Sequence, residues 1–225
     1  MKLQKLFEYL TLGELKQLGI GGYEEHKAIQ VSDYPEVVNH VNLGLINLYT
    51  RFPLLEKELV LETRVDKQLY VLSSRYAEST GNPDWYIQGT FYDDVIRINS
   101  AYIGSTELPI NDEYSPTSIY LPSYNSVQIP FATGSEEIAL IYRAKPEEVT
   151  LDLACEIPIP DVLTEALLVY VEYRIRKSMG GESGIALANQ ALQMYEMLCT
   201  EVERKNLLNN ADNSVCIRAS EGGWV

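Results

Sequence analysis

The chain has 225 residues, 46% hydrophobic and 22% charged, which is typical of a globular protein with one large domain or two smaller ones. Its net charge is −14, from 18 basic and 32 acidic residues, and this excludes a general electrostatic mode of nucleic-acid binding. No apolar run approaches the roughly 18–20 residues that span a membrane, and the N-terminus lacks the features of a secretory signal. We therefore expect synthesis in the cytoplasm.

The first 57 residues are expected to supply the N-terminal helices of a bundle. Residues 2–18 predict one or two short helices, because apolar residues recur there on one face. A further helix should begin near Tyr34-Pro35, where a proline suits the first turn, and run over about 34–51. Its apolar face contains Val41, and its polar face is expected to carry Asn39, His40, Asn42 and Asn47.

Residues 58–152 predict an inserted antiparallel β domain. Segments 59–65 and 68–72 alternate in the manner of a strand pair, with a turn at Asp66-Lys67. Turn residues separate the further strand candidates, which are 85–88, 95–103, 107–110, 118–120, 126–129 and 137–142. Short strands at this spacing are typical of a small antiparallel sheet or barrel.

Residues 153–208 predict a helical hairpin that completes the bundle. Asp161 is a good N-terminal cap for a helix over 161–178, and Gly180-Gly181 should end it. Ser183 is expected to cap the second helix, 184–208, whose apolar stripe is Ile185, Ala188, Leu192, Tyr195, Leu198 and Val202. The predicted fold class is thus α+β: a helical bundle with an inserted antiparallel β domain and an extended C-terminal arm.

The predicted arm, 209–225, has no helical periodicity and ends in an unusual Gly-Gly-Trp-Val sequence. Two interpretations stay open, a frayed end and an arm that docks on a neighbouring protein. Under the second, the partner-binding residues are the apolar anchors Val215, Ile217, Trp224 and Val225.

The sequence offers no recognisable catalytic chemistry. The two histidines, His26 and His40, have no ligand or catalytic spacing, and the three cysteines lack a metal-binding pattern. Adjacent acids such as Asp93-Asp94 would point to opposite faces of a strand. We therefore predict no catalytic, cofactor-binding or metal-binding residue, and a protein that is not an enzyme.

Four segments carry a resemblance to a known family. They are 7–15, the helix and its end at 34–53, the strand 137–146 that leads to the final helices, and 157–174. Together they resemble the head-to-tail adaptor (connector or neck) proteins of tailed bacteriophages.

The resemblance implies a structural virion protein. Such proteins form an oligomeric ring, here of about twelve copies, that binds the portal above and tail or nozzle proteins below. DNA passes through the ring during ejection without sequence-specific binding, and neither a membrane nor a cofactor is involved. The net negative charge has two possible roles: it can keep the protein soluble, or it can keep DNA moving through a passage.

Two alternatives remain. Because the insertion at 58–152 is larger than in minimal adaptors, the chain could be another tail or neck component, such as a tail-tube or second ring protein. A lower alternative is a small enzyme with a carboxylate-based site formed by residues distant in sequence.

Overall fold

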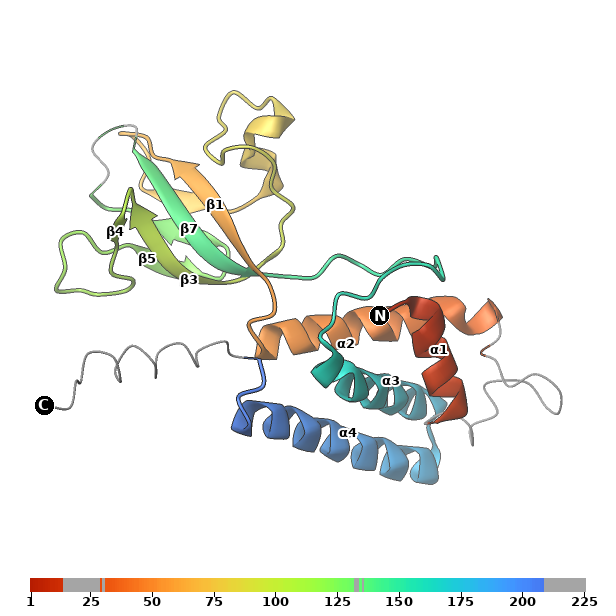
Figure 1. Cartoon of the computed structure of the whole chain (residues 1–225). Helices are drawn as coiled ribbons and strands as arrows, with labels where there is room; N and C mark the ends of the chain where they lie inside the picture. Colours follow the sequence, from red (N-terminus) through yellow and green to blue (C-terminus); the bar gives the residue numbers. More distant parts are fainter. Residues whose placement is uncertain (14–28, 30, 132–133, 135, 209–225) are drawn as a thin grey trace, which may run out of the picture. The chain divides into compact units, whose positions relative to one another are not determined.

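The computed structural model describes residues 1–13, 29, 31–131, 134 and 136–208. It confirms the α+β class, with antiparallel sheets inserted between the second and third of its α-helices (Figure 1). The chain divides into a helical unit, Met1–Leu48 with Glu147–Val225, and a β unit, Tyr49–Pro146. The predicted arm, 209–225, lies outside the described residues.

The helical unit contains α1 (Leu3–Leu12), α2 (Tyr34–Arg51), α3 (Thr164–Met179) and α4 (Gly181–Arg204). The predicted helix at 34–51 is therefore confirmed. Helix α1 buries its predicted apolar face, while a second short helix within 2–18 would lie outside the described residues. The start of α1 is held by the Leu3 amide, which donates to the Cys155 carbonyl at 3.0 Å.

Helices α3 and α4 form the predicted hairpin, with a tighter junction than expected. Gly180 and Gly181 both have positive φ, 68° and 74°, which glycine adopts without steric cost. Helix α4 begins at Gly181, so Ser183 lies inside the helix and the prediction that it is the cap is wrong. The prediction that Asp161 caps the first helix of the hairpin is also wrong, because Asp161 opens a 3₁₀ turn, Asp161–Leu163, and Leu163 occupies the N-cap position of α3.

Helix α2 packs closely on α3. A Cβ built on Gly44 would lie 2.6 Å from Cδ1 of Leu167, so only glycine allows this approach without a shift. The expected polar face of α2 is partly an interior face, because His40 is buried and Asn42 bonds to the backbone of Val149 in both directions. Sequence periodicity missed this because it reads polar residues as solvent-facing.

The stripe predicted for α4 also differs in part. Ile185 is 53% exposed, and the buried positions are Ala188, Ala191, Tyr195, Cys199 and Val202. Two of the buried residues, Ala188 and Ala191, are small, so α4 buries only part of its apolar surface. The rest of that surface is exposed to solvent.

The β unit contains two antiparallel sheets. One has the order β1-β7-β3-β4, formed by Glu56–Glu62, Glu137–Ala144, Val95–Ile103 and Thr106–Glu107. The other has the order β2-β6-β5, formed by Leu69–Val71, Ser126–Gln128 and Tyr120–Ser123. Buried residues from both sheets belong to one hydrophobic cluster, so the two sheets share a core.

The predicted strand pair at 59–65 and 68–72 is wrong. Strand β1 pairs with β7, and β2 pairs with β6 in the other sheet. Their backbones pair in an isolated bridge at the turn, Arg64 to Lys67, and the Arg64 amide also donates to the Tyr70 hydroxyl at 2.8 Å. A local turn signal therefore marked the point where the chain changes sheets.

The tyrosines of the middle segment differ in burial. Tyr70, Tyr86 and Tyr142 are buried with hydrogen-bonded hydroxyls: Tyr86, for example, donates to the Val71 carbonyl at 2.8 Å. Burial raises the pKa of Tyr86, so its hydroxyl stays protonated and available as a donor. A second group, Tyr92, Tyr114 and Tyr124, is exposed.

Substituting Val41→Asp should destabilise the protein by about 3 kcal/mol or more, because Val41 is fully buried in α2 and an aspartate there would be an unpaired buried charge. Urea unfolding measures the change. Val31→Asp is the matched control, since Val31 is 76% exposed. Equal stability of the two variants would contradict a packed α2.

Candidate functional site

The residues predicted to bind a partner, Val215, Ile217, Trp224 and Val225, lie outside the described residues. The described residues form two other surfaces that sequence reasoning did not predict, one in each unit. They are a recess beside strand β3 and the outer face of helix α4.

The recess exists because strand β3 loses its partner partway along one edge. Strand β4 pairs only with Tyr102 and Ile103, and the Leu108 amide then donates to the Ala101 carbonyl at 2.8 Å. The next residue is Pro109, which has no amide hydrogen to continue the ladder. The chain crosses to the other sheet, where Ile110 bridges Ile119.

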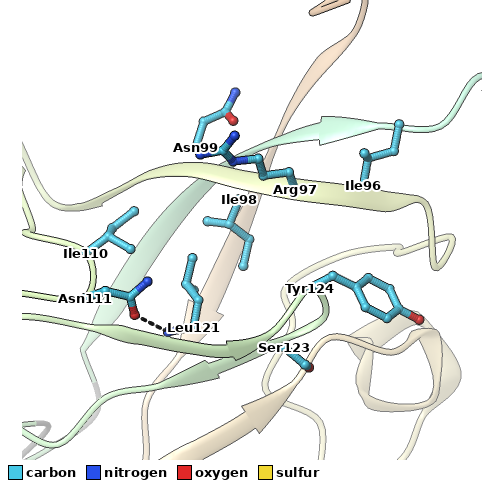
Figure 2. A pocket seen from close by; sticks show the side chains of 9 residues that line it. All are labelled: Ile96, Arg97, Ile98, Asn99, Ile110, Asn111, Leu121, Ser123 and Tyr124. Carbon is cyan, nitrogen blue, oxygen red and sulfur yellow. Dashed lines mark hydrogen bonds between the residues drawn. The ribbon is translucent and has the colours of Figure 1, made fainter. Parts of the chain in front are cut away.

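Residues 96–100 of β3 are therefore paired with β7 on one side only, as far as the described part of the chain extends. The open side faces a recess of about 460 Å³ (Figure 2). It is lined by Ile96, Arg97, Ile98, Asn99, Ile110, Asn111, Leu121, Ser123 and Tyr124. A second recess, of about 390 Å³, shares Asn99 and Ile110 with the first and follows the edge toward Glu107.

The recess combines an apolar floor with a polar rim. Figure 2 shows the side chains of Ile98 and Leu121 in the space between β3 and β5. Asn111 is fixed at the rim, because its Oδ1 accepts a hydrogen bond from the Leu121 amide at 2.9 Å. Arg97 is exposed and makes no ion pair with any described residue. This lining suits binding of an extended polypeptide.

Register shifts in the pairing with β7 leave Ile96 and Asn99 as extra residues on β3. Such bulges bend a strand and re-aim its side chains, and they discourage edge-to-edge pairing with arbitrary strands. The edge of β3 is therefore open but selective.

Leu187, Met194 and Met197 form an apolar stripe on the outer face of α4 and are exposed by 44%, 44% and 57%. With about 3.6 residues per turn, Ile185, which is 53% exposed, falls on the opposite flank of the helix. Leu187 and Met194 border a groove of about 350 Å³ between α3 and α4, with Val169 and Ala191 below them. An amphipathic helix of a soluble protein usually turns charged residues outward, so this face is typical of a protein contact surface.

An ion pair lies in the same groove. The Arg176 Nε donates to Oε1 of Glu172 at 2.6 Å, and the two side chains are only 11% and 15% exposed. Burial of both partners makes the pair costly to break, since either charge alone would lose its compensation. The pair thus keeps the groove polar at its centre without giving it a net charge.

His40 is buried on α2, and burial together with the nearby Arg174 lowers its pKa, although Glu36 opposes the shift. Its Nε2 lies 3.6 Å from Oε1 of Glu36, beyond hydrogen-bond distance. A buried neutral imidazole of this kind packs in the bundle. The other histidine, His26, lies outside the described residues.

Asp94 in the β unit is the one buried carboxylate among the described residues. It accepts hydrogen bonds from the Tyr142 hydroxyl at 3.0 Å and from Lys57 Nζ at 2.6 Å. Burial and the Asp94 charge raise the pKa of Tyr142, which remains a donor. All the acceptor oxygens of Asp94 thus face structural partners.

In the described part of the chain, no three His, Cys, Asp or Glu side chains are grouped closely enough to hold a metal ion. The described helices include none with the length and hydropathy of a membrane span.

No protein-family profile and no curated protein sequence matches this chain. Its function is therefore argued from its own fold and surfaces.

Sequence reasoning missed both surfaces for identifiable reasons. Leu187, Met194 and Met197 follow helical spacing, but they were outside the stripe expected to be buried. Pro109, within the strand candidate 107–110, was the available signal for the end of β4. The open edge of β3 depends on the order of strands in the sheet, which local sequence patterns do not contain.

The substitution His40→Gln should reduce the acid sensitivity of the fold. In the folded state the pKa of His40 lies below its usual value near 6.5, so the unfolded chain binds the proton more readily. The wild type therefore loses stability as the pH falls through and below 6.5, and the variant lacks this contribution. Urea unfolding at pH 8 and pH 5 measures the difference. Equal losses in the two proteins would contradict a lowered pKa.

Proposed function

We propose that this chain is a structural virion protein, the subunit of a ring that connects the portal of a tailed phage capsid to its tail and lets DNA pass. The observation that carries the proposal is the apolar stripe on the outer face of α4, formed by Leu187, Met194 and Met197. It supports an assembly role because a face of this kind gains stability only when another protein covers it.

The energy available from this face is sufficient for a repeated contact. Burying the exposed part of one such side chain contributes on the order of 1 kcal/mol. Three neighbouring side chains give a contact that is weak for one pair of subunits. A ring of about twelve copies would repeat the contact at every interface, and the closed assembly would be stable.

A ring requires heterologous contacts, in which two different surfaces of the same subunit meet. The α4 face is one such surface, and the exposed tyrosines Tyr92 and Tyr124 of the β unit offer another kind of contact residue. The net charge of −14 supports a passage for DNA that does not bind it.

The proposal also assigns a role to residues 209–225. Their sequence joins apolar anchors, Val215, Ile217, Trp224 and Val225, to polar residues that cannot form a core. We propose that this arm attaches the subunit to an adjacent protein of the neck, which includes the portal.

The double substitution Met194→Glu and Met197→Glu should prevent ring formation without unfolding the protein. Both side chains are already about half exposed, so the folded monomer tolerates charge there, whereas an apolar interface does not. Electron microscopy of portal-containing particles gives the occupancy of the ring. Gln193→Glu, an exposed polar position on the same helix, is the control.

If the double variant occupies the ring position normally, α4 is not part of the interface between subunits. Density for the protein along the tail tube, rather than beneath the portal, would favour the alternative of another tail component.

Truncation after Leu208 should leave the melting temperature unchanged, because the buried core that the structure describes is formed by residues before that position. The truncated protein should nevertheless lose its attachment to portal-containing heads. Co-sedimentation with purified heads measures attachment, and the full-length protein is the reference. Equal co-sedimentation would show that the arm is only a frayed end.

A further inference from the structure

We propose that the recess beside β3 binds residues 209–225 of a second copy of this chain, which adds a strand to the open edge. The inference rests on the proposed role of these residues as a docking arm. It goes further by naming the surface that receives them.

Strand β3 has an unpaired backbone edge beside the recess. Residues 96–100 pair with β7 on one side, and no described strand covers the other side. Backbone amide and carbonyl groups at such an edge can bond to an added strand, while side-chain pockets select its sequence. The recess of Figure 2 lies along this edge, which gives a strand both kinds of contact.

The recess and the arm also match each other. In an extended chain Val215 and Ile217 project to the same side, and both are β-branched residues that favour strands. They suit the apolar floor of Ile98 and Leu121, which Figure 2 shows in the same space between β3 and β5. The Asn111 Nδ2 at the rim has no hydrogen-bond partner among the described residues and can donate to a segment rich in asparagine, 209–214. The Asn99 amide and the Ser123 hydroxyl are already bonded, to Glu56 and to Asn125.

The charges of Arg97 and Asp212 also favour this arm as the occupant of the recess. Arg97 is exposed on β3 without an ionic partner among the described residues, in a chain of net charge −14. Asp212 lies three residues before Val215, so in a strand it projects to the side opposite Val215. This places its carboxylate on the side where Arg97 lies relative to Ile98. A segment that brings an acid to Arg97 is thereby preferred over arbitrary strands.

The arm is long enough to reach a second copy of the chain. The 17 residues from 209 to 225 span at most about 55–60 Å when fully extended. That is enough to leave one molecule and reach the next. In a ring, every subunit would donate one arm and receive another, so all edges would be filled at once.

The test traps the contact with Cys216, which lies between Val215 and Ile217 and would project to the side of Asn99. Asn99→Cys is introduced into the full chain carrying Cys155→Ser, while Cys199 is fully buried. A mild thiol oxidant is added over a series of protein concentrations. Non-reducing gels should show about tenfold more linked dimers and larger species than Tyr114→Cys, because docking raises the local thiol concentration.

Three controls give the test its resolution. Tyr114 is 97% exposed and lines neither recess, so it reports random collision. Adding Cys216→Ser should abolish the species that depend on position 99. A synthetic peptide of residues 209–225 with serine at 216 should compete with cross-linking, whereas a scrambled peptide should not.

Each other outcome overturns the proposal. Cross-linking no greater than that of Tyr114→Cys would place the arm elsewhere, and a linked monomer independent of concentration would mean that the chain fills its own recess. The cross-linking proposal and the proposed function can fail separately. If the truncated chain fails to attach to heads and no cross-link forms at position 99, the portal remains as the docking partner of the arm.

Discussion

The pairing of the first and last strands of the β unit is the constraint on which the architecture depends. Strand β1 lies antiparallel to β7, from Glu56 opposite Arg143 to Glu62 opposite Glu137. The chain therefore enters and leaves the β unit at adjacent points, and the Ala144 amide donates to the Leu55 carbonyl there. Because Lys57, Asp94 and Tyr142 are joined at the same end, one buried cluster fixes three strands. An insertion closed in this way lets α2 and α3 pack although 112 residues, 52–163, separate them in sequence.

The helical unit solves the complementary problem of assembling segments from both ends of the chain. Gly44 permits α2 to lie close to α3, and apolar residues such as Val41 and Leu45 supply most of the burial. Polar bonds then fix the register: Asn42 binds the backbone of Val149, and the Tyr195 hydroxyl of α4 donates to Asn47. Hydrophobic burial is not directional, whereas each of these bonds has one geometry. Their contribution is a unique arrangement of the helices more than a large free energy.

The sequence predicted elements whose signals are local and missed relations that are not. Helix α2 and the turn at Gly180-Gly181 were predicted because capping, periodicity and glycine conformation act within a few residues. The 59–65 and 68–72 pairing failed because each strand found a better partner more than fifty residues away. His40 was placed on a polar face, yet α3 covers it. Neither candidate surface was predicted, since an unburied apolar face and an open strand edge are both defined by what does not pack against them.

The two surfaces differ in the kind of partner that they can hold, and this difference bears on assembly. The outer face of α4 carries an apolar stripe on a rigid helix, so it favours a rigid surface of complementary shape. The edge of β3 offers backbone groups and a narrow recess, so it favours an extended segment that becomes ordered on binding. Ordering a segment costs conformational entropy, which makes a single arm contact weak and reversible. A subunit that uses both kinds of contact can first find its place through reversible arms and then be held by the apolar face. In a closed ring, the two together would give order to assembly without requiring either contact to be strong by itself.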